Sequence, residues 1–182
     1  MKKESPAYAE HVVDLFTEIL HKTITVQPLR EVGADITPSL AHGLQFLFQH
    51  EVCSVRDIAL GLAITYSAAS QLTERLVRKG LVTRCDNARD RRLSEIRLTD
   101  SGRKLVEQIK LRRVVGMSRI LKRMDPDRRK SLVENLERFI TAAIEDEKSA
   151  LETCSHCGRD HLAECVINEV YRAATGVPIK RV

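Results

Sequence analysis

The sequence lacks any long uninterrupted apolar run, since charged residues break its apolar stretches every few positions. A bilayer-spanning helix needs about 18 or more consecutive apolar residues. The first twenty residues also lack the apolar stretch of a secretory signal peptide, because Glu4, Glu10, Asp14 and Glu18 interrupt them. We therefore expect a cytoplasmic protein with no membrane partner.

Secretory features are missing as well, so the five cysteines do not suggest a disulfide framework. They suggest free thiols, metal ligands or a redox site. No internal repeat or low-complexity tract is present. With 43% hydrophobic and 30% charged residues, the 182-residue chain can bury an ordinary core, and we expect one compact domain with appendages.

Positive charge is concentrated in one region. Residues 75–130 hold 19 Lys and Arg against 7 Asp and Glu, whereas the rest of the chain holds 11 against 18. A net charge of +12 in one region suits a polyanion such as nucleic acid, although an anionic membrane surface or a merely solvated face gives the same pattern.

Helical spacing of apolar residues predicts a first amphipathic helix that contains Val12, Val13, Phe16, Ile19 and Leu20. A loop with Pro28 and Gly33 is expected next. Thr37 as N-cap and Pro38 at the first helical position then predict a helix that ends near His50.

Two short helices and two β-rich segments are predicted next. After an extended link at Val52 and Cys53, Ser54 caps a helix in which Asp57 completes a capping box. Its expected apolar contacts are Ile58, Leu60 and Leu62. A turn over residues 63–66 leads to a helix over residues 67–79 that Gly80 ends, followed by strands over residues 81–85 and 93–98. This order is typical of a winged helix-turn-helix.

Two long helices complete this part of the chain, one capped by Thr99 and reaching about Met124, the other started by Asp125 and Pro126. The second carries an apolar stripe suited to a dimer core, formed by Leu132, Val133, Leu136, Phe139, Ile140, Ala143 and Ile144. We expect a mainly α fold with four parts: a dimerisation helix and connector (1–36), a winged helix-turn-helix (37–99), long dimerisation helices (100–149) and a Cys/His-rich module (150–182).

Three blocks of this sequence resemble one family. They are SAASQLTERLVRKGLVTR (67–84), the sequence Asp90, Arg91 and Arg92, and LTDSGRKL (98–105). In order and spacing they resemble the recognition helix, wing and following helix of the MarR family of bacterial winged-helix regulators, over about residues 10–147. The resemblance implies an all-α dimer with a small β wing, in which the N- and C-terminal helices of two subunits interleave.

The predicted recognition helix begins with short polar side chains that fit the major groove. We expect Ser67, Ala68, Ser70 and Gln71 to read bases, with Ala68 against a thymine methyl group and Gln71 on adenine. Arg75 and Arg78 suit phosphate or guanine. Helix capping and solvent exposure are the alternative for the two serines. Leu72, Leu76 and Val77 are expected in the core.

The predicted wing tip carries Arg89, Arg91 and Arg92 beside Asp86 and Asp90. The carboxylates can orient guanidinium groups that enter a narrow minor groove. The resemblance places Asp90 and Arg92 in the family's Asp-x-Arg wing motif. The alternative is that these two residues pair only to hold the hairpin.

The C-terminal region departs from the family pattern and carries a candidate metal site. Cys154 and Cys157 form a C-x2-C knuckle before Gly158, and a helix begun near Asp160 would place His161 and Cys165 on one face. The predicted ligands are Cys154, Cys157, His161 and Cys165, with His156 as a possible substitute. Four such ligands favour Zn²⁺, with an iron–sulfur cluster as the main alternative, and a redox thiol pair or no site remain open.

Together these features predict a homodimeric regulator, not an enzyme, that represses transcription from a pseudo-palindromic operator in double-stranded DNA. A small-molecule effector is a further expected partner, and the metal module either braces the dimer or senses metal or redox state. The alternatives are a metal-dependent enzyme or oxidoreductase that uses the cysteine cluster, and an interaction adaptor without DNA. Four protein ligands argue against catalytic zinc, which keeps one position open. Cys53 and Cys85 are expected to be small buried residues.

Overall fold

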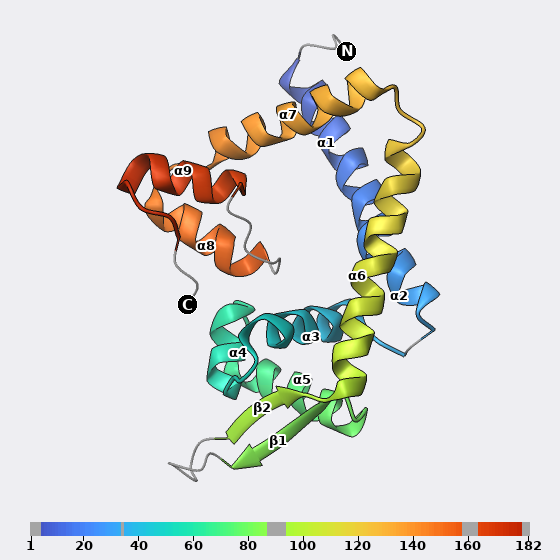
Figure 1. Cartoon of the computed structure of the whole chain (residues 1–182), viewed down its shortest axis with the longest axis vertical. Coiled ribbons are helices and arrows are strands. Elements are labelled where there is room, and N and C mark those ends of the chain that lie inside the picture. Colours follow the sequence, from blue (N-terminus) through green and yellow to red (C-terminus); the bar gives the residue numbers. More distant parts are fainter. Residues whose placement is uncertain (1–4, 34, 87–93, 158–163, 180–182) are drawn as a thin grey trace.

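A computed structural model describes residues 5–33, 35–86, 94–157 and 164–179. The described chain is mainly helical with one two-stranded antiparallel sheet (Figure 1). Its elements are α1 (Pro6–His21), a π-helical turn (Lys22–Val26), α2 (Gln27–Glu31), α3 (Pro38–His50), α4 (Val55–Gly61), α5 (Tyr66–Arg78), β1 (Val82–Asp86), β2 (Ser94–Leu98), α6 (Asp100–Leu121), α7 (Pro126–Ala143), α8 (Glu147–Cys157) and α9 (Val166–Thr175). None of the described helices is both long and apolar enough to cross a membrane.

The N-terminal helix is longer than the sequence indicates. After α1, the wider π-helical turn continues into α2, and Pro28 lies in the first turn of α2. The predicted loop at Pro28 is therefore wrong, because proline is tolerated in a first helical turn, where its missing N–H is not required. The helix ends before Gly33, whose φ is 64°.

The winged helix-turn-helix is confirmed, and its helices begin at side-chain caps. Thr37 accepts a hydrogen bond from the Leu40 N–H (3.4 Å), and Ser54 and Asp57 form the expected capping box. The structure corrects the start of α5, which is Tyr66 and not Ser67: Thr65 is the N-cap and accepts from the Ala68 N–H (3.2 Å). The turn before this cap includes Ala63, which takes a positive φ of 52°.

The sheet lies beside the helix-turn-helix at one end of the molecule (Figure 1). β1 and β2 are antiparallel, with Val82 opposite Leu98 and Asp86 opposite Ser94. The predicted extended link is also present, since Cys53 forms an isolated bridge with Ile96. A helix-turn-helix and a β-hairpin are thus joined into one unit.

One hydrophobic core holds this unit to α6. Its largest fully buried apolar side chains include Leu44, Leu47, Ile58, Leu76, Ile96 and Val106. Two predicted core positions are wrong: Leu60 is 70% exposed and Val77 is 39% exposed. Each lies off the buried side of its helix, and on α5 Thr73 is buried instead, with its hydroxyl donating to the Ala69 carbonyl (2.8 Å).

The long helices α6 and α7 begin at Thr99 and Asp125 as expected, although α6 ends at Leu121. Neither α1 nor α7 has a buried residue in this chain. Large apolar side chains remain exposed along three helices, namely Val12, Val13, Leu15 and Ile19 of α1, Leu111 and Val114 of α6, and Val133 and Phe139 of α7. We call these eight side chains the exposed apolar stripe.

A second, small core forms at the C-terminal end of α7, where α8 and α9 form a hairpin (Figure 1). Ala150, Ile167 and Ile179 are buried there, and Ile140 and Ile144 of the α7 end pack against them. Buried Asn168 accepts a hydrogen bond from the Ile179 N–H through its side-chain oxygen (2.9 Å), which fixes the segment after α9. The Cys/His-rich module is therefore packed on the end of α7.

The local structure of this module differs from the prediction in two ways. Cys154 and Cys157 both lie in helix α8 and not in a knuckle. The following helix begins at Val166 with Cys165 as its N-cap residue, and not near Asp160. Gly158 and His161 lie outside the described residues.

Candidate nucleic-acid interface

Helix α5 buries one side and exposes the other. Ala69, Leu72, Thr73 and Leu76 pack inward. Successive residues of an α-helix are rotated by about 100°, so the side chains that point most directly outward lie on the side of α5 opposite these four buried residues. These side chains are Ser67, Gln71, Glu74 and Arg78, all of them exposed.

The predicted base-reading residues occupy the outer side of the first two turns. Ser67, Ala68 and Gln71 are exposed, and Ser70 is half-buried, with its hydroxyl donating to Glu74 Oε1 (3.4 Å). Because Thr65 caps the helix, the capping alternative for Ser67 is wrong. Arg75 and Arg78 are exposed in the last turn of the same helix.

Two exposed residues of this helix were missed from the sequence. Tyr66 is 62% exposed at the first helical position, and Glu74 lies on the outward line one turn after Gln71. The signal for Glu74 was available, since it follows Ser67 and Gln71 at helical spacing. The sequence-based prediction of DNA contacts included only positive and neutral side chains, so Glu74 is absent from it.

A recess of about 390 Å³ lies between α5 and β1. The residues that line it are Thr73, Glu74, Val77, Arg78 and Arg84. Two guanidinium groups beside an open recess suit a phosphate of a nucleic-acid backbone. Arg84 is thus a further candidate contact.

The rest of the wing is only partly described. The predicted residues Arg89, Asp90, Arg91 and Arg92 lie outside the described residues, as does the side chain of Asp86. Cys85 on β1 is exposed, so its predicted burial is wrong, because its side chain points away from the core that Ile96 and Val82 enter. Cys53 is buried as expected, and burial, aided by the Asp57 carboxylate, raises the pKa of its thiol to about 11.

Comparison with known proteins finds a partial family match, in which residues 35–93 match the model of the MarR family. The HTH-type transcriptional repressor MdtR of Bacillus subtilis (strain 168) is 28% identical over 117 residues, which span 64% of this chain and 76% of MdtR.

Solved structures share the fold of most of this chain. RV1404 from Mycobacterium tuberculosis superposes with a TM-score of 0.71 at 26% identity, over 80% of this chain and 99% of RV1404. The Staphylococcus aureus MepR–DNA complex gives a TM-score of 0.54 at 26% identity, over 73% of this chain and 96% of MepR. About a fifth of this chain therefore has no counterpart in RV1404.

The positive charge is not confined to the winged helix. Residues 110–130 hold nine Lys and Arg against two Asp, a net +7 of the +12. They run from the middle of α6 to the start of α7, toward the end of α6 that lies away from the winged helix (Figure 1). The charge excess therefore supports nucleic-acid binding by the winged helix less than the sequence suggests.

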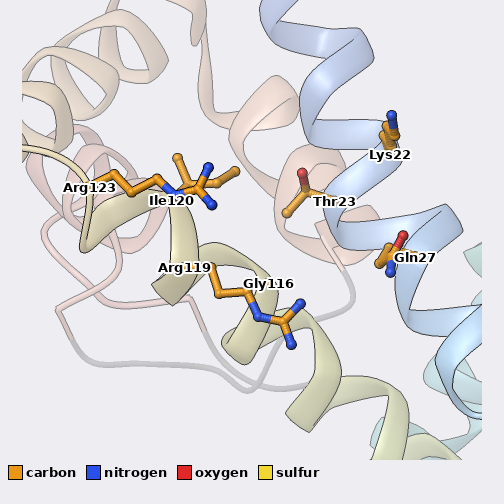
Figure 2. Close-up of a pocket in the computed structure, with 7 residues that line it drawn as sticks. All are labelled: Lys22, Thr23, Gln27, Gly116, Arg119, Ile120 and Arg123. Atoms are coloured by element: carbon orange, nitrogen blue, oxygen red, sulfur yellow. The ribbon is translucent and has the colours of Figure 1, made fainter.

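Part of this second basic region lines a recess of about 230 Å³ between the π-helical turn and α6. Figure 2 shows Lys22, Thr23 and Gln27 on one side, and Gly116, Arg119, Ile120 and Arg123 on the other. Glu31 lies 3.7 Å from the Arg119 guanidinium group. No ion pair among the described residues includes Lys22 or Arg123.

Three thiols lie together at the α8–α9 hairpin. Cys154 and Cys157 are one turn apart at the end of α8, and Cys154 and Cys165 contact the same small core. Burial, followed by the neighbouring Cys157 and Cys165, raises the pKa of the Cys154 thiol. Within the described parts of the chain, no three His, Cys, Asp or Glu side chains converge as a metal site. His161 and the side chain of His156 lie outside those parts.

Proposed function

We propose that this chain is a homodimeric, sequence-specific regulator that binds a pseudo-palindromic operator in double-stranded DNA and represses transcription. The observation that carries the proposal is the outer face of α5, where Ser67, Ala68 and Gln71 precede Arg78 on a helix that begins at an exposed end of a MarR winged helix. MdtR is named a repressor, and MepR was crystallised with DNA, which supports the same activity for this chain.

In this proposal, the first turns of α5 enter the major groove. Ala68 contacts a thymine methyl group, and the Gln71 amide pairs with an adenine edge. Arg78 and Arg84 hold the phosphate backbone at the recess between α5 and β1. The wing arginines Arg89, Arg91 and Arg92 would reach the adjacent minor groove, with Asp90 orienting Arg92.

Arg78→Ala tests this contact surface. We expect operator affinity to fall by about 5- to 150-fold, because one charge-assisted contact is worth about 1–3 kcal/mol. Fluorescence anisotropy on a duplex selected from random DNA by the wild-type chain measures the change. The matched control is Arg172→Ala on α9, an exposed arginine far along the chain from the winged helix. Equal affinities of the Arg78→Ala chain and the wild type would contradict the proposed surface.

The exposed apolar stripe is the surface that a second copy covers in this proposal. Helices α1 and α7 are amphipathic, yet neither has a fully buried side chain within one chain. Isolated exposed apolar residues are ordinary, but eight large ones on three neighbouring helices favour an interface. Interleaved N- and C-terminal helices are also what the family resemblance implies.

The comparisons point away from an enzyme, since the matched relatives are transcriptional regulators. The remaining alternative is an adaptor that keeps the winged helix without DNA. In that case substitutions on the outward face of α5 would leave every DNA affinity unchanged, and the Arg78→Ala experiment separates the two functions.

We propose further that the α8–α9 hairpin binds zinc through Cys154, Cys157, Cys165 and His161, with His156 as the substitute ligand. The support is the grouping of three thiols, which are soft ligands for zinc or an iron–sulfur cluster. These residues would hold zinc between the C-terminal end of α8 and the start of α9, where it would act as a cross-link. The hydrophobic core of this hairpin is small, and a bound metal would add to the stability that this core provides.

The recess between the π-helical turn and α6 is our proposed effector site. Lys22, Arg119 and Arg123 favour a small anion, and Ile120 gives it an apolar wall. We expect Arg123→Gln to weaken benzoate binding by about tenfold in calorimetry, because one of three cations is lost. Arg128→Gln, which does not line the recess, is the control. Unaltered benzoate binding by the Arg123→Gln chain would remove this site.

A further inference from the structure

Glu74 stands at the centre of the surface that meets DNA in the proposed function. It lies seven residues after Ser67 and three after Gln71, opposite the buried side chains of Leu72, Thr73 and Leu76. Its carboxylate is exposed and accepts a hydrogen bond from the Ser70 hydroxyl at 3.4 Å. Among the described ion pairs none includes Glu74, although Arg78 and Arg84 line the same recess.

A carboxylate at this place is repelled by the phosphates on both sides of a groove. Such a charge lowers affinity for every duplex unless a base donates a hydrogen bond to it. In the major groove, the cytosine N4 amino group is the donor that glutamate and aspartate accept. Glu74 would therefore give higher affinity for duplexes that offer this donor than for duplexes that do not.

We propose that Glu74 reads cytosine in each half-site of the operator. This inference rests on the proposed DNA-binding function. Glu74 lies about 12 Å along α5 from Tyr66, at 1.5 Å per residue, so it reaches a different base pair from Ser67 and Ala68. The Ser70 hydroxyl holds the carboxylate on the outward line, and Arg78 one turn later binds the backbone beside it.

The test is selection of duplexes from random DNA by four full-length chains: wild type, Glu74→Gln, Glu74→Ala and Glu169→Gln. Glu169 is an exposed glutamate on α9, so its substitution removes the same charge far from α5. We expect wild type and Glu169→Gln to select one C·G pair per half-site that Glu74→Ala no longer selects. Glu74→Gln is expected to prefer adenine there, because glutamine pairs with its edge.

Affinities on matched duplexes then give the size of the effect. Replacing that C·G pair by T·A is expected to weaken the wild type by about 5- to 150-fold and Glu74→Ala by less than about twofold. Circular dichroism melting checks that the four chains are folded.

Two results overturn the inference. If Glu74→Ala selects the same C·G pair as the wild type, or gains affinity equally for all duplexes, the carboxylate only repels phosphate. If the wild-type chain selects no sequence at all, the proposed regulator function fails first, and the inference fails with it.

Discussion

Phe139→Asp is expected to separate the proposed dimer into single chains and to weaken operator binding by about 100-fold or more. Phe139 is 66% exposed near the C-terminal end of α7, and it belongs to the exposed apolar stripe that a second copy covers in our proposal. An aspartate there places an unpaired charge in an apolar interface, once in each copy. Without the dimer, the two half-sites are no longer bound by one tethered pair of winged helices. Sedimentation velocity and anisotropy on the selected duplex measure the two effects.

The control for Phe139→Asp is Val177→Asp, the same kind of change at an exposed apolar residue of the C-terminal region. It is expected to leave both the mass in solution and operator affinity unchanged. A Phe139→Asp chain that stays dimeric at micromolar concentration would show that the exposed apolar stripe is not the interface.

Cys154→Ser is expected to lower zinc affinity by about 100-fold or more. Cys154 is one of two partly buried thiols of this group, and a serine hydroxyl is a poor substitute for a thiolate ligand. The measurement is elemental analysis for zinc, iron and sulfide on untagged protein purified without oxygen, followed by competition with a chelator. We expect about one zinc per wild-type chain.

The matched control for zinc binding is Cys85→Ser, which removes an exposed thiol from β1 and should keep the metal. If the wild-type protein contains iron and sulfide, the cofactor is an iron–sulfur cluster and not zinc. The metal module would be refuted by two results together. The wild-type chain would contain neither metal, and its affinity for added zinc would be no higher than that of the Cys154→Ser chain.

The proposed zinc site would also bear on regulation, because the hairpin core includes Ile140 and Ile144 at the end of α7. Loss of the metal would loosen this end, and α7 also carries Phe139 of the proposed dimer surface. A sensing module changes operator affinity when the metal is removed from an intact dimer, whereas a structural module does not.

Helix starts were predicted well because their signals are local. Thr37, Ser54 with Asp57, Thr99 and Asp125 each cap the helix that the sequence indicates. The failures arise where the backbone departs from common conformations. The sequence predicts a loop at Pro28, whereas a π-helical turn leads into α2, which contains Pro28, and a turn with a positive φ at Ala63 precedes the start of α5.

The exposed side of α5 was predicted more accurately than its buried side. Ser67, Ala68, Gln71 and Arg78 are on the outer side of α5 as expected, whereas Val77 was placed in the core that Thr73 enters. Thr73 is a buried polar residue whose hydroxyl is satisfied by a carbonyl one turn earlier. Helical spacing alone does not distinguish such a residue from a solvated one.

The cysteine region was predicted in composition but not in local structure. A C-x2-C pair before glycine is typical of a knuckle, yet α8 continues through Cys157. Contacts distant in sequence explain the difference, since Ala150 on α8 packs against Ile167 on α9 and Ile140 on α7. Such contacts cannot be inferred from the spacing of the cysteines.

Sequence-specific DNA binding by the winged helix is tested most directly by one ratio of affinities. It compares the wild-type chain on its selected duplex with the same chain on a scrambled duplex of equal length, at the same salt concentration. We expect the selected duplex to contain two half-sites whose centres lie about 10 base pairs or a multiple apart, and to bind about 1,000-fold or more tightly than the scrambled one. A ratio near one at every salt concentration would contradict a sequence-specific regulator.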